Sequence, residues 1–259
     1  MANAQTAPQL RFSIEAWSAW APGLTDADAW RQWARRPQLP GGDERPELPQ
    51  YPMLLRRRAE RLARMALHTV AQVRAAAACP MVYASPRGET QRAVHMLREL
   101  ATTGTVAPGP FSLSVHNAVA ALESIAHADT GNYTALAAAG ETAELAIVEA
   151  LGLLAEGHDQ VIVTVYDETL PQCYRSDVAE ADAAFAWSWR VARAEDGAGF
   201  ELTWDGLETA DGFGSRDPGP GSRPPPLPPA LRILQFFLSD AESLSHDGSH
   251  CRWTWRKVA

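Results

Sequence analysis

Cysteine is scarce in this chain of 259 residues, which contains only Cys79, Cys173 and Cys251. An odd number of widely spaced cysteines does not make a disulfide framework, and no two of them have the spacing of metal ligands. The sequence therefore predicts free thiols in a reducing compartment. It gives no reason to expect a metal ion or another cofactor.

Long apolar runs and an excess of basic residues are also missing. No stretch approaches the roughly 20 apolar residues that span a bilayer, and residues 1–10 lack a basic segment followed by an apolar one. Basic residues number 23 against 31 acidic ones, a formal net charge of -8. Nucleic acids and anionic membranes would be repelled unless a local basic patch overrides this charge. We expect a cytoplasmic protein without either partner.

The apolar content of 46% is enough for one sizeable core. Nothing before residue 205 has the composition of a linker, so residues 1–259 are expected to form a single domain. Residues 205–229 are rich in Gly, Pro, Asp and Ser and end in a proline-rich run. This composition favours a polyproline segment and predicts a mobile loop.

Hydrophobic periodicity alternates between that of helices and that of strands. The pattern predicts strands at residues 11–17, 79–84, 134–139 and 160–165, and helices at 53–78, 89–101, 115–128, 141–155 and 230–238. A strand, helix, strand order indicates a parallel sheet covered by helices. Period-two patterns at residues 185–191, 200–204 and 251–255 predict antiparallel edge strands. The expected class is α/β, with a mixed sheet, a parallel core, antiparallel edge strands and helices on both faces.

Several sequence blocks resemble those of a known family. They are PMLLRRR at 52–58, YASPRGE at 83–89, FSLSVHNA at 111–118, TALAA at 134–138 and VYDE at 165–168. In this order they resemble the short ketosynthase-like proteins of aryl polyene and xanthomonadin-type pigment clusters, over about residues 10–257. The SVHN part is the most specific element.

This resemblance implies a truncated thiolase-like fold, little more than the amino-terminal half of a full ketosynthase. It also implies a heterodimer with a catalytically complete β-ketoacyl-acyl carrier protein (ACP) synthase. Such subunits are similar to the chain-length factors of aromatic polyketide systems, which help to shape the tunnel for the growing chain. The expected partners are that ketosynthase and ACP, and the isolated chain could form a homodimer.

Ketosynthases use a cysteine at a strand-to-helix turn, where the helix amino terminus stabilises the thiolate. By the resemblance, this turn falls at Ala139, Gly140 and Glu141. None of these residues is a thiol, and neither are the neighbours Ala138 and Thr142. The sequence therefore predicts a vestigial nucleophile turn in a non-catalytic subunit.

Other nucleophiles allow competing hypotheses. Ser112 or Ser114 with His116 and Asp129 suggests a hydrolase, but a glycine-flanked nucleophile elbow is missing. We interpret Ser114 as a helix cap, with His116 and Asn117 in the first helical turn, at a dimer interface or against a neighbouring loop. An independent acyltransferase or ketosynthase acting on ACP thioesters through Cys79 or Ser114 stays open, as does a separate acyl-binding module.

Two clusters of titratable residues remain. His246 and His250 flank Asp247 and Gly248, which predicts exposed histidines in a turn rather than a metal or catalytic pair. The other cluster is basic. It could dock the acidic surface of ACP, or form a solvated helix face with ion pairs to Glu47 and Glu60. Its members are Arg56, Arg57, Arg58, Arg61 and Arg64.

Overall fold

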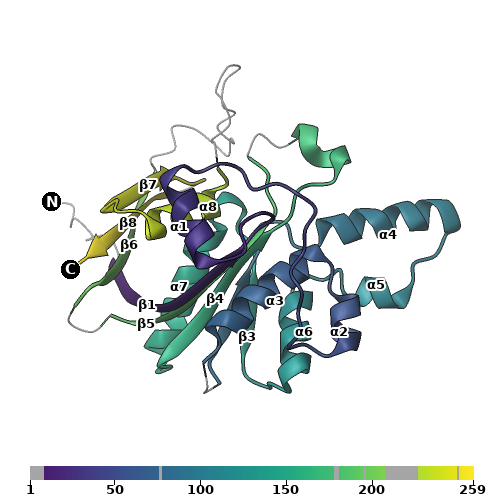
Figure 1. The fold of residues 1–259 in the computed structure, drawn as a ribbon, viewed down its shortest axis with the longest axis horizontal. Coiled ribbons are helices and arrows are strands. Elements are labelled where there is room, and N and C mark those ends of the chain that lie inside the picture. Colours follow the sequence, from purple (N-terminus) through teal and green to yellow (C-terminus); the bar gives the residue numbers. More distant parts are fainter. Residues whose placement is uncertain (1–8, 76–77, 178–180, 195–196, 208–226, 250) are drawn as a thin grey trace.

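The computed structural model describes residues 9–75, 78–177, 181–194, 197–207, 227–249 and 251–259. Within these residues one eight-stranded sheet has the order β3-β2-β4-β5-β1-β6-β8-β7 (Figure 1). Among the described strands, the two parallel pairs are β2 with β3 and β2 with β4. The strands are β1 Gln9–Trp20, β2 Met81–Ala84, β3 Tyr133–Leu136, β4 Gln160–Asp167, β5 Phe185–Arg193, β6 Gly199–Gly206, β7 Ser243–Asp247 and β8 Cys251–Val258.

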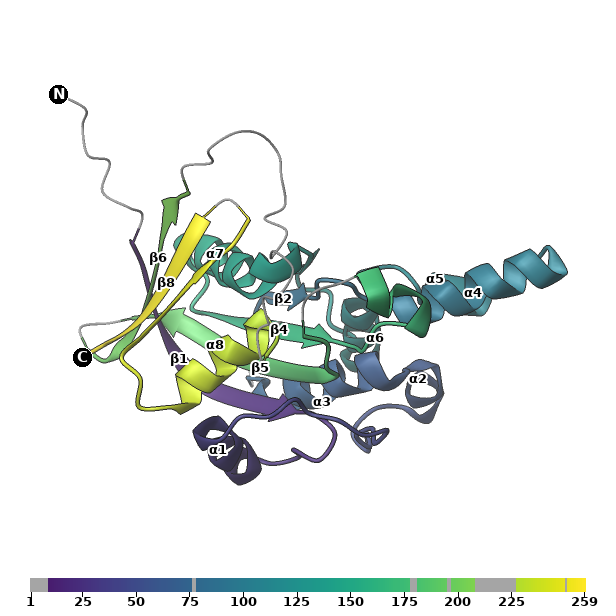
Figure 2. The same ribbon diagram turned by 90° about the horizontal axis from the view of Figure 1, so that it is seen from above.

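Helices cover both faces of the sheet, as predicted (Figure 2). One face packs against α2 (Met53–Arg58), α3 (Arg61–Val73) and α6 (Ala118–His127). The other packs against α1 (Ala27–Arg35), α7 (Thr142–Ala155) and α8 (Pro229–Leu238). Side chains alternate along β4 accordingly, because successive residues of a strand point to opposite faces. Val163 and Val165 join one core cluster, whereas Ile162 and Tyr166 join the other.

The predicted mixed sheet is confirmed, and its antiparallel part extends further inward than the edge. β5 and β1 lie in the middle of the sheet, between the parallel strands and the β6-β8-β7 edge. Trp187 and Trp189 of β5 are fully buried with ring centroids 4.4 Å apart, and Trp255 of β8 packs edge-on against Trp189. These tryptophans are core residues because helices cover the strands that carry them.

The helical pattern predicted over 53–78 is split into α2 and α3. Ala59 between them has extended backbone, and Arg64 satisfies the carbonyl groups at the break. Its guanidinium donates to the carbonyl oxygens of Ala59 at 3.0 Å and Arg56 at 2.6 Å. The break therefore depends on a side chain one helical turn further on.

The predicted helix cap at Ser114 is wrong. α6 begins at Ala118 with Asn117 at the cap position, while the Ser114 hydroxyl donates to the carbonyl of Phe111 at 2.8 Å. Ser85 accepts from the backbone N–H of Gly88 and so orders the loop before α4 (Thr90–Thr103). α4 and the short α5 (Pro108–Ser112) extend to one side of the molecule (Figure 2).

Most of the loop predicted at 205–229 lies outside the described residues. Asp205 and Gly206 end β6, and Pro229 begins α8. No helix in the described ranges is both long and apolar enough to cross a membrane.

Candidate functional site

The turn between β3 and α7 is the candidate site. After β3 the chain forms a 3-10 turn, η1 (Ala139–Glu141), before α7 begins. Ala139 has a φ of 46°, in the left-handed region. Among the described residues other than glycine, only Ala128, which ends α6, also has a positive φ. The hydroxyl of Thr142 fixes the turn by donating to the carbonyl of Ala139 at 2.7 Å and accepting from the N–H of Ala138.

A strained strand-to-helix turn of this kind is the backbone geometry of a nucleophile elbow. Such strain costs about 1 kcal/mol or more and persists only where the surroundings enforce it. Of the three residues predicted at the turn, Ala139 carries the strain. Its methyl group offers no nucleophile.

The Glu141 side chain contacts the β7-β8 hairpin. The indole N–H of Trp253 donates to its Oε1 at 2.8 Å. Gly248, in the hairpin turn, approaches the same carboxylate so closely that a Cβ there would lie 2.0 Å from Oε1. The contacts of Glu141 are therefore those of a residue that docks the hairpin.

Gly248→Ala is expected to lower the free energy of unfolding by about 1–3 kcal/mol. The added methyl group displaces the Glu141 carboxylate and breaks its hydrogen bond to Trp253. Denaturant unfolding measures the loss. The matched control is Gly206→Ala on β6, where a Cβ meets nothing within 4 Å. Equal stability of the two variants would show that the contact is unimportant.

Glu144, in the first turn of α7, carries a buried carboxyl group that was not predicted from the sequence. It is fully buried, its Oε1 accepts from the indole N–H of Trp255 at 3.4 Å, and Nε2 of His246 lies 3.2 Å from the same oxygen. Oε2 has no hydrogen-bond partner in the described residues. Burial, followed by the charge of Glu141, raises the pKa of Glu144 to about 8.

The prediction that His246 is an exposed loop histidine is wrong. It lies on β7, its side chain is 9% exposed, and burial followed by the charge of Arg232 lowers its pKa. The sequence Ser-Leu-Ser-His-Asp gives only a weak signal for this short strand, because it contains a single apolar residue. His250 falls outside the described residues. In the ranges that the structure describes, no three His, Cys, Asp or Glu residues are grouped as metal ligands.

A small cavity adjoins the turn. Its volume of about 20 Å³ holds roughly one water molecule. Arg87 and Asp167 line it and form an ion pair, with the Nε of Arg87 3.1 Å from Oδ2 of Asp167. Burial raises the pKa of Asp167 to about 6 against the opposing effect of Arg87. Two of the sequence blocks that carry the family resemblance therefore meet beside Ala139.

The SVHN block lies against the same region. Nε2 of His116 is 2.8 Å from the carbonyl oxygen of Leu136, the last residue of β3. A Cβ at Gly88, which has a φ of 54°, would lie 2.8 Å from Nδ1 of His116. Asn117 donates to the hydroxyl of Tyr133 at 3.4 Å. His116 and Asn117 thus contact β3 and the loop that contains Gly88.

The proposed hydrolase residues do not form a triad. The hydroxyl groups of Ser112 and Ser114 donate to nearby backbone carbonyls, those of Gly109 and Phe111. Asp129 instead pairs with Arg74, 2.9 Å from its Nη2.

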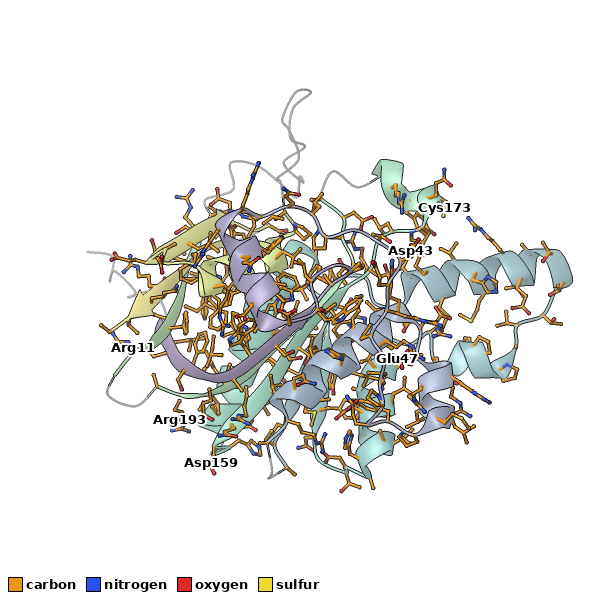
Figure 3. The ribbon with its side chains drawn as sticks, in the orientation of Figure 1. Arg11, Asp43, Glu47, Asp159, Cys173 and Arg193 are labelled. Carbon is orange, nitrogen blue, oxygen red and sulfur yellow. The ribbon has the colours of Figure 1, made fainter. Side chains whose placement is uncertain are left out.

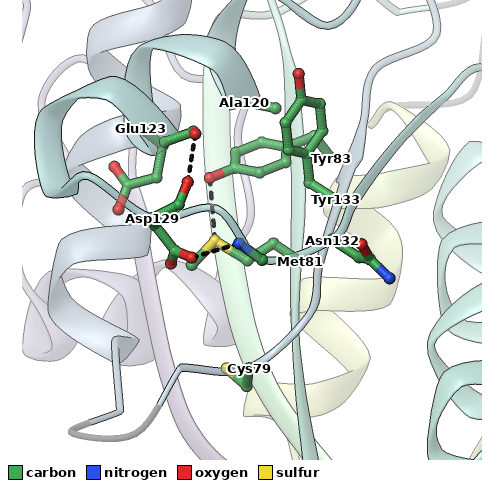
Figure 4. A pocket seen from close by; sticks show the side chains of 10 residues that line it. Cys79, Met81, Tyr83, Ala120, Glu123, Asp129, Asn132 and Tyr133 are labelled. Atoms are coloured by element: carbon green, nitrogen blue, oxygen red, sulfur yellow. Dashed lines mark hydrogen bonds between the residues drawn. The ribbon is translucent and has the colours of Figure 1, made fainter.

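Neither Cys79 nor Cys251 is activated as a nucleophile. Cys79 precedes β2, at the opposite end of that strand from the turn, and lines a pocket of about 10 Å³ (Figure 4). Burial raises its thiol pKa. The thiol of Cys251 has its pKa raised by burial and by the charge of Glu141, which opposes thiolate formation. Cys173 is exposed, on the 3-10 helix η2 (Gln172–Asp177) (Figure 3).

The predicted basic cluster is divided. Arg57 and Arg58 are exposed at the end of α2. Arg61 instead pairs with Glu168, 2.8 Å from Nε to Oε2, and its Nη1 donates to the carbonyl of Gly42. This pairing raises the pKa of Arg61 and leaves its side chain largely covered. A docking surface on α2 therefore excludes Arg61.

Comparisons with known proteins agree with this geometry. No curated protein matches the chain. A solved structure of a ketosynthase (ApeO) in complex with its chain length factor (ApeC), from Xenorhabdus doucetiae, is similar with a TM-score of 0.79 and 24% identity. The match covers 95% of this chain and 99% of that one.

Longer relatives share the fold over part of their length. The ishigamide ketosynthase/chain length factor matches with a TM-score of 0.57 and 18% identity, over 73% of this chain and 65% of that one. AntDE:AntF, a type II polyketide synthase acyl-carrier protein in complex with its ketosynthase, matches with a TM-score of 0.56 and 10% identity, over 72% and 64%. The chain thus spans about two thirds of these proteins.

Residues 30–256 match the sequence profile described as "Beta-ketoacyl synthase, N-terminal domain". This match extends over most of the chain and includes the strained turn, the Arg87–Asp167 pair and the β7-β8 hairpin. The chain therefore belongs to the β-ketoacyl synthase family and has its thiolase-like fold.

Proposed function

We propose that this chain is a non-catalytic, chain-length-factor-type subunit that completes a heterodimer with a full-length ketosynthase. The observation that carries the proposal is Ala139. The strained turn that would present a nucleophile holds a methyl group, and the adjoining cavity has room for about one water molecule rather than an acyl chain. An acyl tunnel would then be formed together with the partner.

The edge of the sheet at β3 supports a partner subunit. Among the described strands, β3 pairs only with β2, so its outer edge presents unpaired backbone groups. Tyr133 of β3 is 37% exposed, and Val115, next to the residues that contact β3, is 45% exposed. Further exposed apolar residues lie on α4 and α5, namely Leu97, Leu100 and Phe111. Exposed apolar surface beside an open strand edge is typical of an interaction site.

We further propose that Arg57 and Arg58 contact an acyl carrier protein. Both are exposed in a protein whose overall charge is negative. Acidic carrier surfaces would be steered toward such a local positive patch. The resemblance of the sequence blocks to proteins of aryl polyene clusters supports a polyene or related polyketide as the product.

Co-expression with a full-length, catalytically complete ketosynthase from the same organism tests the proposal. We expect the two chains to co-purify in a 1:1 complex, and the isolated chain to show no condensation of ACP thioesters. Ala139→Cys is expected to add no activity, because the cavity beside the turn, which Arg87 and Asp167 line, has room for only about one water molecule. Acyl transfer by the isolated wild-type chain, lost on Cys79→Ala or Ser114→Ala, would instead establish an independent acyltransferase.

A further inference from the structure

A groove between α4 and η2 lies outside the site described above. Its volume is about 430 Å³, within the range of about 300–1,000 Å³ of small-molecule sites. One wall is a single face of α4, since its residues are spaced three or four apart. The other wall is η2 and the loop before it. The lining residues are Gln91, Val94, His95 and Arg98 of α4, with Leu170, Pro171, Gln172 and Arg175.

The polar lining of this groove is basic. His95, Arg98 and Arg175 contribute imidazole and guanidinium groups, and no described carboxylate lines the groove. The basic lining of the groove contrasts with the whole chain, in which 31 acidic residues outnumber 23 basic ones. Carboxylates neutralise other arginines, as Glu123 does for Arg74 and Glu168 does for Arg61. No ion pair within the described residues neutralises Arg98 or Arg175.

Two of the polar residues are held in place by backbone. Nε of Arg175 donates to the carbonyl of Leu170 at 3.0 Å, which leaves the terminal guanidinium nitrogens available. The side-chain amide of Gln91 donates to the carbonyl of Thr169 at 2.7 Å. Fixing these side chains in advance lowers the entropy that a ligand must overcome on binding.

Two apolar residues of the lining are buried, and we refer to them as the floor of the groove. Val94 and Leu170 are 7% and 5% exposed. A ligand that fits would therefore carry a charged group for the rim and an uncharged body for the floor.

We infer that this groove binds a small phosphate ester, with the phosphate held by Arg98, Arg175 and His95. Guanidinium groups suit phosphate because their planar arrays of N–H donors match its oxygens. The apolar floor of Val94 and Leu170 accommodates the organic part of the ester.

Calorimetric titration of the full chain with inorganic pyrophosphate, at constant ionic strength, tests this site. We expect saturable 1:1 binding with a Kd of about 1 mM or tighter, and at least tenfold weaker binding for the double variant Arg98→Gln/Arg175→Gln. The matched control is Arg35→Gln/Arg36→Gln, which removes the same charge from exposed positions in and after α1.

The exposed Cys173 on η2 gives a second measurement. Bound pyrophosphate is expected to slow its reaction with an uncharged maleimide in the wild type and the control but not in the groove variant. Absence of saturable heat, or equal weakening in both double variants, would overturn the site and leave only non-specific attraction. Neither result depends on a ketosynthase partner, so the test is independent of the proposed function.

Discussion

Introducing aspartate at Val115 and Tyr133 is expected to weaken the complex with the partner ketosynthase by at least about thirtyfold. Both side chains are exposed beside the open edge of β3, and Asn117 links the loop after α5 to Tyr133. Burying two carboxylates in an apolar interface leaves them without partners, at a cost of several kcal/mol. Co-purification and a binding titration measure the loss.

Leu39→Asp is the control for this pair. Leu39 is also an exposed apolar residue, at 46%, but it lies in the loop after α1. Since all three positions are exposed, we expect the melting temperatures of the isolated variants to stay close to that of the wild type. Unchanged partner binding by the double variant, or an equal loss with Leu39→Asp, would show that the partner does not use the β3 edge.

Glu144→Gln is expected to remove a pH-dependent loss of stability. The folded-state pKa of Glu144 is raised to about 8 from an ordinary value of 4.5. Between these values the folded chain holds this proton more tightly than the unfolded chain. The free energy of unfolding therefore falls as the pH rises through this window, by up to about 1.4 kcal/mol per pH unit.

The clearest window for the measurement is pH 6.5–8. The lowered pKa of His246 has the opposite sign, because stability is lost as the pH falls below the ordinary histidine value of 6.5. Above that pH, the neutral form of His246 predominates in both states. Denaturant unfolding should show a smaller decline with pH for Glu144→Gln than for the wild type. The control Glu156→Gln, an exposed residue after α7, should keep the wild-type slope. Three identical slopes would contradict the assignment.

The sequence predicted the helices and strands well where hydrophobic periodicity was strong. Val161 to Val165 alternate between two covered faces, so burial alone marks this strand. Short polar elements were not predicted. β7 contains one apolar residue, Leu244, and its formation depends on pairing with β8, which contributes Trp253 and Trp255. Propensity within five residues cannot report a partner strand.

Only the residue types at the candidate site could be predicted from the sequence. The absence of a thiol at residues 139–141 follows from the sequence once the family blocks are aligned, and the strained φ of Ala139 identifies the residue within that turn. The hairpin contact of Glu141 and the burial of Glu144 beside His246 were not predicted. Both arise from residues distant in the chain.

The sequence by itself determined the fold class, the family and the lack of a nucleophilic side chain at the turn, because these depend on local periodicity and residue identity. Only the tertiary structure decided which charged groups are free. Arg61 is paired with Glu168, while Arg98 and Arg175 line an open groove. Whether a charged side chain is available depends on its burial and on the partners that the fold brings close to it. Neither can be predicted from the spacing of residues in the sequence.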